Sequence, residues 1–203
     1  MGIIPLYSKV FYRDIIDIGD EDFLLLQNNV KNSFFTIASD EIKKPSLIND
    51  DYEILDKPQF QKIKNLIMEK FYMFMRDHMK ISNDFKISSS WLTKTEPDHF
   101  SHSHKHHNCY YSGVFYVDTD ENGGDIIFEN VFDQRFLLNN IEQNVYNTRF
   151  VNFKTKNKMI IFFPSEIHHK ISVNKTNKDR YSIAFNFYPI GKIGDHDSSV
   201  SIS

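Results

Sequence analysis

Residues 110–130, YYSGVFYVDTDENGGDIIFEN, contain two short runs rich in β-branched and aromatic residues, one on each side of a turn. The first run, residues 110–118, and the second, residues 125–129, have the composition of β-strands. The residues between them, DTDENGG at 118–124, combine Asp, Asn and Gly, which turns favour. This stretch therefore predicts two strands joined by a turn, and the fold around it is expected to be built on strands.

Further strands are predicted on both sides of this pair. Residues 132–144 form a polar loop, which we expect to shape the entrance of any site that the strands create. Six or more short strands after one long helix favour a mainly β chain with flanking helices, folded as an antiparallel sandwich or barrel. The additional strands are expected at residues 85–95, 146–154, 158–163, 170–173 and 180–188.

The residues before these strands predict two helices, at 20–31 and at about 57–79. Asp56 is expected to cap the longer helix, with Gln59 as its capping-box partner and Pro58 in the first turn. Apolar residues then recur at helical spacing and predict a stripe that faces the core. The stripe consists of Phe60, Ile63, Leu66 or Ile67, Phe71, Phe74 or Met75, and Met79.

The bulk composition is that of a single globular domain. The chain has 203 residues, of which 40 % are hydrophobic and 25 % are charged, enough for one sizeable core. We expect residues 1–190 to form one domain, with helical support at about 20–80 and the β core at about 85–188. Residues 191–203 are expected to be a polar C-terminal tail that frays.

Charge, hydropathy and cysteine content argue against several classes of protein. A formal net charge of −3 gives no strong nucleic-acid signal, because such binding usually needs a basic face. No apolar run approaches the roughly 18 residues of a membrane span, and the opening residues do not resemble a signal peptide. Cys109 is the only cysteine, so no disulfide framework is expected, and a cytoplasmic location follows as a prediction.

Histidines are concentrated in two places. Five of the nine lie in residues 99–113, HFSHSHKHHNCYYSG, and a neighbouring pair at 168–169 follows the apolar run MIIFFP. Because strand side chains alternate between faces, His102, His104 and His106 are expected to share one face. Neutral imidazoles are good ligands for iron, zinc, copper and nickel. The two clusters therefore predict one metal site, with an exposed polyhistidine patch as the alternative.

An arginine in the last predicted strand indicates what else the site binds. In residues 178–187, KDRYSIAFNF, Arg180, Ser182, Ala184 and Asn186 alternate with apolar residues and are expected to share a face. An inward-facing Arg is costly unless it meets an anion, and its planar fork matches a carboxylate. A carboxylate site is therefore predicted here, with an exposed surface ion pair as the alternative.

Together, the motifs resemble those of the iron(II)- and 2-oxoglutarate-dependent oxygenases, and more narrowly a small bacterial and phage branch of that superfamily. They are HxH followed by Asn, SGVFYV, a glycine turn with DIIFEN, FFPSEIHHKIS and RYSIAFN, over about residues 90 to 188, and the opening PLYSKVFY is also similar. The resemblance implies a double-stranded β-helix (a cupin-like jelly roll) with iron at its mouth, in the cytoplasm of a bacterial or phage-infected cell.

The activity that the resemblance implies is that of a dioxygenase. Such an enzyme uses Fe(II) and O₂ and couples decarboxylation of 2-oxoglutarate to oxidation of a substrate, with hydroxylation as the default outcome and ascorbate as an added reductant in vitro. The candidate partners are an unidentified substrate, either a small molecule or a protein side chain, and a second copy of the chain in a homodimer. No membrane partner is expected.

The metal ligands that the resemblance implies are His104, His106 and His169. The wider superfamily usually has Asp or Glu where this chain has His106. A three-histidine site leaves iron with its full double charge, which the dianionic 2-oxoglutarate would neutralise. His102 is the alternative to His106, and His168 is the alternative to His169.

The pair that would hold the far carboxylate of 2-oxoglutarate falls on Arg180 and Ser182. Asn108, Tyr116 and Asn186 are further candidates to line the same pocket, and a packing role is the alternative for each of them.

Two other functions stay open on the sequence alone. A cupin-type metalloenzyme shares the jelly roll and HxH, but a Glu is expected where this chain has Tyr110 and Tyr111. A non-catalytic jelly-roll module that holds a metal is the second alternative. The Arg180 and Ser182 pair argues against such a module, because a structural metal has no use for a carboxylate clamp.

Overall fold

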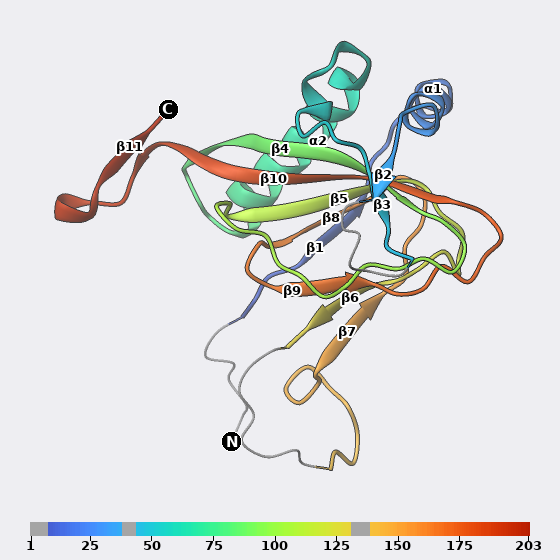
Figure 1. The fold of residues 1–203 in the computed structure, drawn as a ribbon. Coiled ribbons are helices and arrows are strands. Elements are labelled where there is room, and N and C mark those ends of the chain that lie inside the picture. Colours follow the sequence, from blue (N-terminus) through green and yellow to red (C-terminus); the bar gives the residue numbers. More distant parts are fainter. Residues whose placement is uncertain (1–7, 38–43, 131–138) are drawn as a thin grey trace.

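The computed structural model describes residues 8–37, 44–130 and 139–203. Two antiparallel sheets face each other, and two helices, α1 (Asp20–Lys31) and α2 (Gln61–Met73), cover the outer face of the larger sheet (Figure 1). Within these ranges no helix is both long and apolar enough to cross a membrane.

The larger sheet contains eight strands among the described residues. Its order is β1 (Tyr12–Ile15), β8 (Met159–Pro164), β5 (Tyr111–Asp118), β10 (Arg180–Ile193), β4 (Asp84–Thr95), β3 (Leu47–Ile48) and β2 (Thr36–Ile37), and β11 (Val200–Ile202) pairs with β10. Every pairing is antiparallel. The long strand β10 lies between β5 and β4 and therefore contributes side chains to the centre of the molecule.

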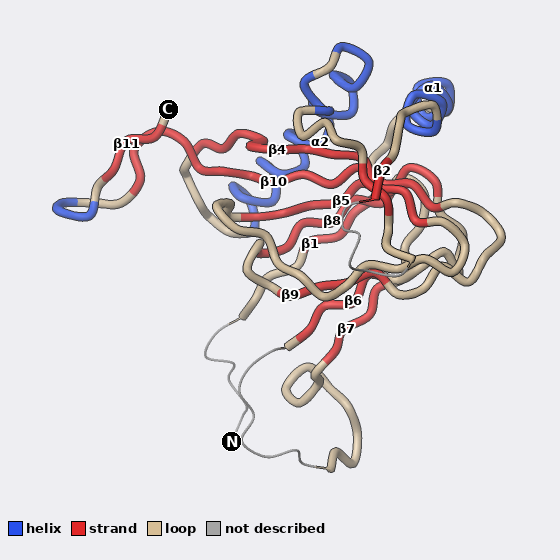
Figure 2. The backbone as a smooth tube through the Cα atoms, in the orientation of Figure 1, coloured by secondary structure: helices blue, strands red, loops and turns tan. Residues whose placement is uncertain are grey.

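The smaller sheet consists of three described strands, β7 (Phe150–Phe153), β6 (Ile126–Glu129) and β9 (His168–Ile171), in that order. Figure 2 shows the two layers of strands and the long loops that join them. Two facing antiparallel sheets are the architecture of a jelly roll, so the predicted mainly β fold with flanking helices is confirmed.

The alternation along β10 divides the interior into two parts. Tyr181, Ile183, Phe185 and Phe187 belong to the core that packs against the helices, as the sequence pattern predicted. The opposite face of β10 looks into the space between the sheets, where a second apolar cluster forms. Gly113 on β5 is needed in this core, since a Cβ there would lie 2.3 Å from the ring of Phe185.

Most predicted strands are confirmed within one or two residues. β10 runs past the predicted end at residue 188 to Ile193, and two other strands differ in a way that matters. β7 covers only Phe150–Phe153, shorter than the predicted 146–154. β9 begins at His168 and not at residue 170, so both neighbouring histidines lie inside a strand. The short strands β1, β2, β3 and β11 were not predicted.

The start of the long helix corrects the predicted capping box. A 3₁₀ turn at Ile54–Asp56 and a second at Pro58–Phe60 precede α2, and neither turn nor helix has a side-chain cap. The Gln61 side chain donates instead to the carbonyls of Leu55 (3.1 Å) and Asp56 (3.0 Å), and the Asp56 carboxylate pairs with Lys64. The amide of Asp56, one of the two donors that the capping box was expected to satisfy, donates to the carbonyl of Glu53 at 2.9 Å in the first of these turns.

The core-facing stripe of this helix is confirmed. α2 is followed by a π-helical turn at Phe74–His78, and the stripe continues through it. The buried members are Phe60, Ile63, Ile67, Phe71, Phe74 and Met75, while Leu66 and Met79 are partly buried against the same core.

The C-terminal residues were expected to fray, but they are ordered in the structure. β10 continues to Ile193, and residues 200–202 fold back to pair with residues 191–193. Lys86 on β4 also donates to the carbonyl of Ser203 at 2.8 Å. Of the polar loop predicted at 132–144, the part up to residue 138 lies outside the described residues.

The Phe71→Ala variant is expected to be strongly destabilised. Phe71 is fully buried, and its ring stacks on that of Phe187 with 3.5 Å between centroids. Removing a buried aromatic ring leaves a cavity and costs about 3–5 kcal/mol of unfolding free energy, which urea denaturation measures. Leu24→Ala on the exposed face of α1 is the control and should change stability by less than about 0.5 kcal/mol. Equal stability of the two variants would contradict this account of the core.

Candidate active site

Three imidazoles from two distant segments meet in the structure. His104, His106 and His169 each offer one ring nitrogen, and these three atoms lie within 4.8 Å of one another. Their ring centroids are 4.4 Å (His104–His169), 5.1 Å (His106–His169) and 5.4 Å (His104–His106) apart. In the described part of the chain, no other group of three or more His, Cys, Asp or Glu residues is arranged to hold a metal ion.

Backbone hydrogen bonds bring the two segments together. The amide of His104 donates to the carbonyl of His169 at 2.9 Å, and the amide of His169 donates to the carbonyl of His104 at 2.8 Å. Two residues further on, the amide of His106 donates to the carbonyl of Ser165 at 3.0 Å. The histidine-rich segment therefore lies beside β9 and the turn that precedes it. This places His104 and His106 next to His169.

The alternative ligands considered from the sequence are not part of this cluster. His102 is exposed, and its ring lies 5.0 Å from that of Phe100. His168 alternates with His169 along β9 and pairs with Glu129 of β6, so its side chain is on the other face of the smaller sheet. The cluster thus contains His106 and His169.

The hydrogen bonds of the three rings determine which nitrogen is free. Nδ1 of His104 lies 2.8 Å from the carbonyl of His102, and Nδ1 of His169 lies 3.0 Å from the carbonyl of Ile167. Nδ1 of His106 lies 2.7 Å from Oδ1 of Asn186. These oxygens can only accept, so each Nδ1 carries the proton and donates it. All three Nε2 atoms therefore keep a lone pair that can ligate a metal.

A polar network fixes the ring of His106. Asn186 accepts from His106 through Oδ1, and its Nδ2 donates to the hydroxyl of Ser89 at 2.9 Å. The hydroxyl of Ser112 donates to the same Oδ1 at 2.7 Å and lies 2.9 Å from that of Ser165. Asn186 was predicted at the site, whereas the serines were not. The strand register could have indicated two of these serines, because Asn186 pairs with Ser112 on one side and with Ser89 on the other.

Burial keeps two of the imidazoles neutral. Desolvation lowers the pKa of His106 from 6.5 to about 4, against the hydrogen bond to Asn186, which raises it. Desolvation, reinforced by the neighbouring His104, lowers the pKa of His169 from 6.5 to about 3. Both rings are therefore uncharged at neutral pH, which is the form that binds a metal.

The same two pKa values predict how the stability of the metal-free protein depends on pH. Because both are lowered on folding, the unfolded chain takes up protons below about pH 6.5 that the folded chain does not take up until about pH 4 and 3. Stability should be full above pH 6.5 and fall at lower pH, by up to about 2 kcal/mol for His169 at pH 5. Urea denaturation midpoints at pH 7 and pH 5 measure this loss of stability. An equally large loss of stability between these pH values in a His169→Gln variant would contradict the prediction.

A second polar site surrounds Arg180 at the start of β10. Arg180 is 2 % exposed, and its guanidinium carbon lies 5.0 Å from the ring centroid of Tyr116. Ser182 follows on the same face, pairs with Tyr116 across β5, and its hydroxyl lies 2.6 Å from that of Thr93. The residues predicted to bind a carboxylate, Arg180, Ser182 and Tyr116, are therefore brought together.

This second site has donors without acceptors. Nε and Nη2 of Arg180 and the hydroxyl of Tyr116 are buried and have no hydrogen-bond partner among the described residues. Burial raises the pKa of Tyr116 to about 12, so its hydroxyl keeps its proton. Burial also lowers the pKa of Arg180, which reflects the cost of a desolvated cation. An anion with several acceptor oxygens would satisfy all three groups.

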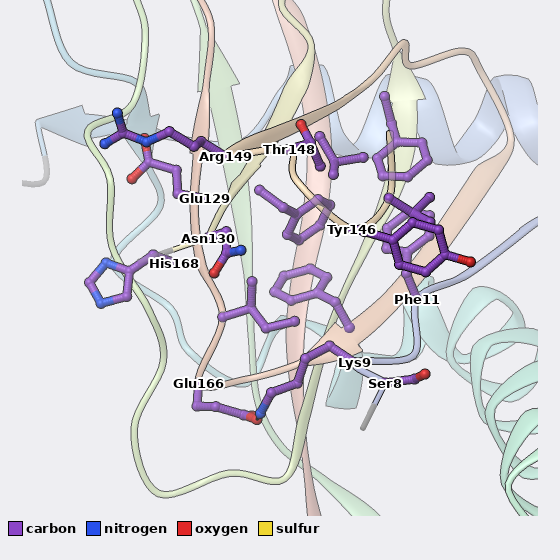
Figure 3. Close-up of a pocket in the computed structure, with 16 residues that line it drawn as sticks. Ser8, Lys9, Phe11, Glu129, Asn130, Tyr146, Thr148, Arg149, Glu166 and His168 are labelled. Carbon is purple, nitrogen blue, oxygen red and sulfur yellow. The ribbon is translucent and has the colours of Figure 1, made fainter. Parts of the chain in front are cut away.

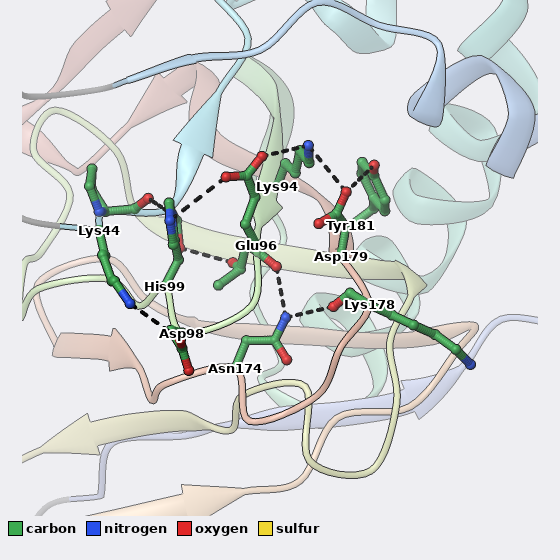
Figure 4. Close-up of polar contacts among 12 residues, drawn as sticks. Lys44, Lys94, Glu96, Asp98, His99, Asn174, Lys178, Asp179 and Tyr181 are labelled. Carbon is green, nitrogen blue, oxygen red and sulfur yellow. Dashed lines mark hydrogen bonds and ion pairs between the residues drawn. The ribbon is translucent and has the colours of Figure 1, made fainter.

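A polar network at the strand ends supports the turn that precedes Arg180 (Figure 4). The side chain of Asn174 is fully buried and donates to the carbonyls of Thr95 (2.9 Å) and Lys178 (2.8 Å). Lys94 pairs with Asp179, the residue before Arg180, at 3.1 Å. The turn that leads into β10 is thus tied to the end of β4.

Two further residues complete the account of the site. Asn108, predicted as a pocket residue, is exposed and has a φ of 57°, a left-handed conformation that Asn tolerates. Its observed position is therefore that of a turn residue. Trp91, on the inward face of β4, lies 5.4 Å from the ring of His106 and forms a wall beside the histidines.

Asn186 is expected to position His106. Replacing it with Leu removes the acceptor that fixes the ring, and loss of such a partner typically lowers metal affinity about 10–100-fold. Competition with a chelator of known affinity measures the effect on iron(II) binding. Asn186→Asp keeps an acceptor toward Nδ1 and should recover most of the affinity. Equal affinities of the Leu and Asp variants would show that the hydrogen bond does not matter.

The sequence and the fold both match known proteins. Residues 89–186 match the family described as "Putative 2OG-Fe(II) oxygenase". No curated protein matches the chain. Among solved structures, a Pseudomonas putida prolyl-4-hydroxylase has a TM-score of 0.64 at 12 % identity, with 91 % of this chain and 95 % of that chain covered.

Two other solved structures share the fold at similarly low identity. HygX from Streptomyces hygroscopicus, with nickel, 2-oxoglutarate and hygromycin B bound, has a TM-score of 0.63 at 10 % identity, covering 89 % of this chain and 83 % of that one. A prolyl hydroxylase from Trichoplax adhaerens, in complex with a peptide fragment of hypoxia inducible factor, has a TM-score of 0.62 at 11 % identity, with coverage of 88 % and 83 %.

Proposed function

Because residues 89–186 match the family described as "Putative 2OG-Fe(II) oxygenase", we propose that the chain binds iron(II) through His104, His106 and His169 and acts as a 2-oxoglutarate-dependent dioxygenase. The observation that carries this proposal is the convergence of three imidazoles whose Nδ1 atoms all donate to fixed acceptors. Three neutral nitrogen ligands on one side of an ion suit iron(II) and leave its remaining positions open.

The buried donors around Arg180 support 2-oxoglutarate as the second bound group. A carboxylate would accept from Nε and Nη2 of Arg180 and from the hydroxyl of Tyr116, the three groups that lack partners. Ser182 lies next to them and adds a hydroxyl. Arg180 and Asn186 lie on the same inward face of β10, so one strand contributes to both the carboxylate site and the support of His106.

The charges at the two sites fit the same ligand. Three neutral histidines leave the full double charge of iron(II) uncompensated, and the nearby guanidinium adds a third positive charge. A dianion with one carboxylate for Arg180 and a keto acid end for the metal compensates most of this charge. A monoanion would leave one of the two sites unsatisfied.

In the proposed mechanism the protein binds and orients. When bound, iron(II) and 2-oxoglutarate supply the oxidising chemistry, in which O₂ oxidises the substrate while 2-oxoglutarate is converted to succinate and CO₂. His104, His106 and His169 hold the metal, and Asn186 fixes one of these rings. Arg180, Tyr116 and Ser182 fix the far end of 2-oxoglutarate. Trp91 and Phe163 pack beside the histidine cluster, with ring centroids 5.4 Å from His106 and 4.7 Å from His169.

Succinate formation tests the proposal. The purified protein, supplied with iron(II), 2-oxoglutarate, ascorbate and O₂, is expected to release succinate, and more of it when a substrate is present. The alternative of a non-catalytic metal-binding module, or of a cupin-type enzyme, requires no 2-oxoglutarate. Tight binding of one equivalent of zinc, with no binding or turnover of 2-oxoglutarate in the iron-loaded protein, would overturn the proposal.

We further propose that the reaction is hydroxylation of a small molecule or a protein side chain. We also propose that the enzyme acts in the cytoplasm and that a second copy of the chain can join it in a homodimer. The single cysteine supports the location, because no disulfides are needed. Residues 1–190 are proposed to act as one domain, supported by a core that joins both helices to the larger sheet. Mass spectrometry of candidate substrates for a gain of one oxygen atom tests the reaction.

A further inference from the structure

A cavity of about 800 Å³ lies beside the histidine cluster. Its walls come from the segment before β1, from β6, from β7 and the loop before it, and from the turn between β8 and β9 (Figure 3). Its volume is in the range of pockets that bind small organic ligands, about 300–1,000 Å³. None of the residues assigned to iron or 2-oxoglutarate lines it, so the cavity is available to a third ligand.

Two aromatic side chains are shared by the cavity and the histidine cluster. Phe128 and Phe163 line the cavity, and their ring centroids lie 6.1 Å and 4.7 Å from that of His169. A ligand in the cavity is therefore separated from the cluster by a single layer of side chains. A substrate that reaches from the cavity past these rings would place its reacting part at the metal.

The interior of the cavity is apolar. Phe11 stacks on Phe153 with 4.2 Å between centroids, and together they bridge the strands that border the cavity. Tyr146 and Val151, which also line it, are 63 % and 40 % exposed. Apolar side chains left open to solvent around a concave site are typical of ligand-binding surfaces.

The charges at the rim are mostly paired. Lys9 and Glu166 form an ion pair at one end of the cavity, and Glu129 lies with Arg149 at the other (Figure 3). The Glu129 carboxylate already pairs with Lys170 at 2.6 Å and accepts from Ser103.

Arg149 differs from the other rim charges. It is exposed, and no described carboxylate lies within 4.0 Å of its guanidinium. With Glu129 already neutralised, Arg149 leaves the described residues at this end of the cavity with one positive charge to offer. The rim therefore complements a negatively charged group on a ligand whose body is apolar.

We propose that this cavity binds the substrate through an apolar, ring-sized group and a carboxylate that pairs with Arg149. The inference rests on the proposed function in so far as the ligand is the substrate of the oxygenase. The cavity as a binding site stands on its own lining. The carboxylate belongs either to a small organic acid or to the C-terminus of a polypeptide, and both sources present the same chemistry to Arg149.

Calorimetric titration of the full chain, with and without iron(II), tests the proposal. The probes are 4-phenylbutyrate, its neutral amide, and a tetrapeptide ending in Phe with a free or an amidated C-terminus. The acid is expected to bind about tenfold more tightly than the amide, as one charge-assisted contact predicts. Binding of phenylbutyrate alone supports the small acid as the source, and preference for the free-acid peptide supports the polypeptide. Equal affinities of acid and amide would overturn the proposal.

Two variants separate the apolar and charged contributions. Val151→Trp fills the cavity and should abolish binding of both probes, whereas Arg149→Gln should weaken the acid about tenfold and leave the amide unchanged. Leu24→Trp, on the distant exposed face of α1, is the matched control and should bind like the unmodified protein. Unaltered binding in Val151→Trp, with its fold verified by circular dichroism, would place the probe elsewhere and reject the cavity.

The outcomes for the cavity and for the oxygenase are distinguishable. Succinate formation without probe binding rejects the cavity alone. Probe binding that depends on Val151 and Arg149, without succinate formation, keeps the cavity as a carboxylate-binding site and rejects the oxygenase.

Discussion

The His169→Ala variant is expected to lose stoichiometric iron(II) binding, and succinate formation with it. His169 is buried, its Nδ1 is held by the carbonyl of Ile167, and its backbone makes both hydrogen bonds of the bridge to His104. The alanine variant keeps the backbone bridge and removes the imidazole that carries the ligand nitrogen. Because even the outer partners of a ligand are worth about 10–100-fold in affinity, loss of a ligand should cost more than about 100-fold.

Equilibrium dialysis with iron(II) under argon measures this loss, and the neighbouring residue supplies the control. His168→Ala removes an imidazole one position away, on the opposite face of β9, and should keep a full equivalent of iron. Full binding in His169→Ala combined with loss in His168→Ala would reverse the assignment.

The Arg180→Ala variant is expected to bind 2-oxoglutarate about 100-fold more weakly while its iron(II) binding stays intact. The guanidinium provides two buried donors without partners, and charge-assisted hydrogen bonds contribute about 1.5–3 kcal/mol each. Arg180→Lys keeps the charge but loses the planar fork, so its affinity should lie between those of the alanine variant and the unmodified protein. The three affinities are measured by titrating 2-oxoglutarate into the iron-loaded proteins and recording the metal-to-ligand charge-transfer absorption.

The same residue gives a readout that does not depend on turnover. A buried cation without an anion is costly, so Arg180→Met should make the ligand-free protein more stable than the unmodified one. Adding 2-oxoglutarate should stabilise the unmodified protein and not the variant. An unchanged 2-oxoglutarate affinity in Arg180→Ala would show that another group holds the far carboxylate.

The sequence predicted best where one strand determines its own faces. In β10 the strict alternation separated Arg180, Ser182 and Asn186 from the apolar residues that pack on the helices, and the structure has the same division. Prediction was weaker where a feature depends on its partners. The two-residue strand β3 forms beside β4 and, among the described strands, β2 in turn pairs only with β3. The capping box at Asp56 failed because two 3₁₀ turns precede the helix.

The choice among the histidines needed three-dimensional information. Spacing alone left His102 and His106 as equal candidates, because both share a face with His104. The hydrogen bond from the amide of His106 to Ser165 and the contact of its ring with Asn186 distinguish the two. The serines that complete this network come from β4, β5 and the turn after β8, and only the register brings them together.

The position of the two adjacent histidines in β9 has a consequence for how this site would tolerate change. His169 faces the histidine cluster and His168 lines the cavity. The length of the turn at residues 165–167 determines which of the two faces the cluster. Inserting one residue there would shift β9 by one position and turn every side chain to the other face. The metal would then meet His168 in place of His169, so a change in chain length could exchange two chemically identical ligands while it displaces all of their neighbours.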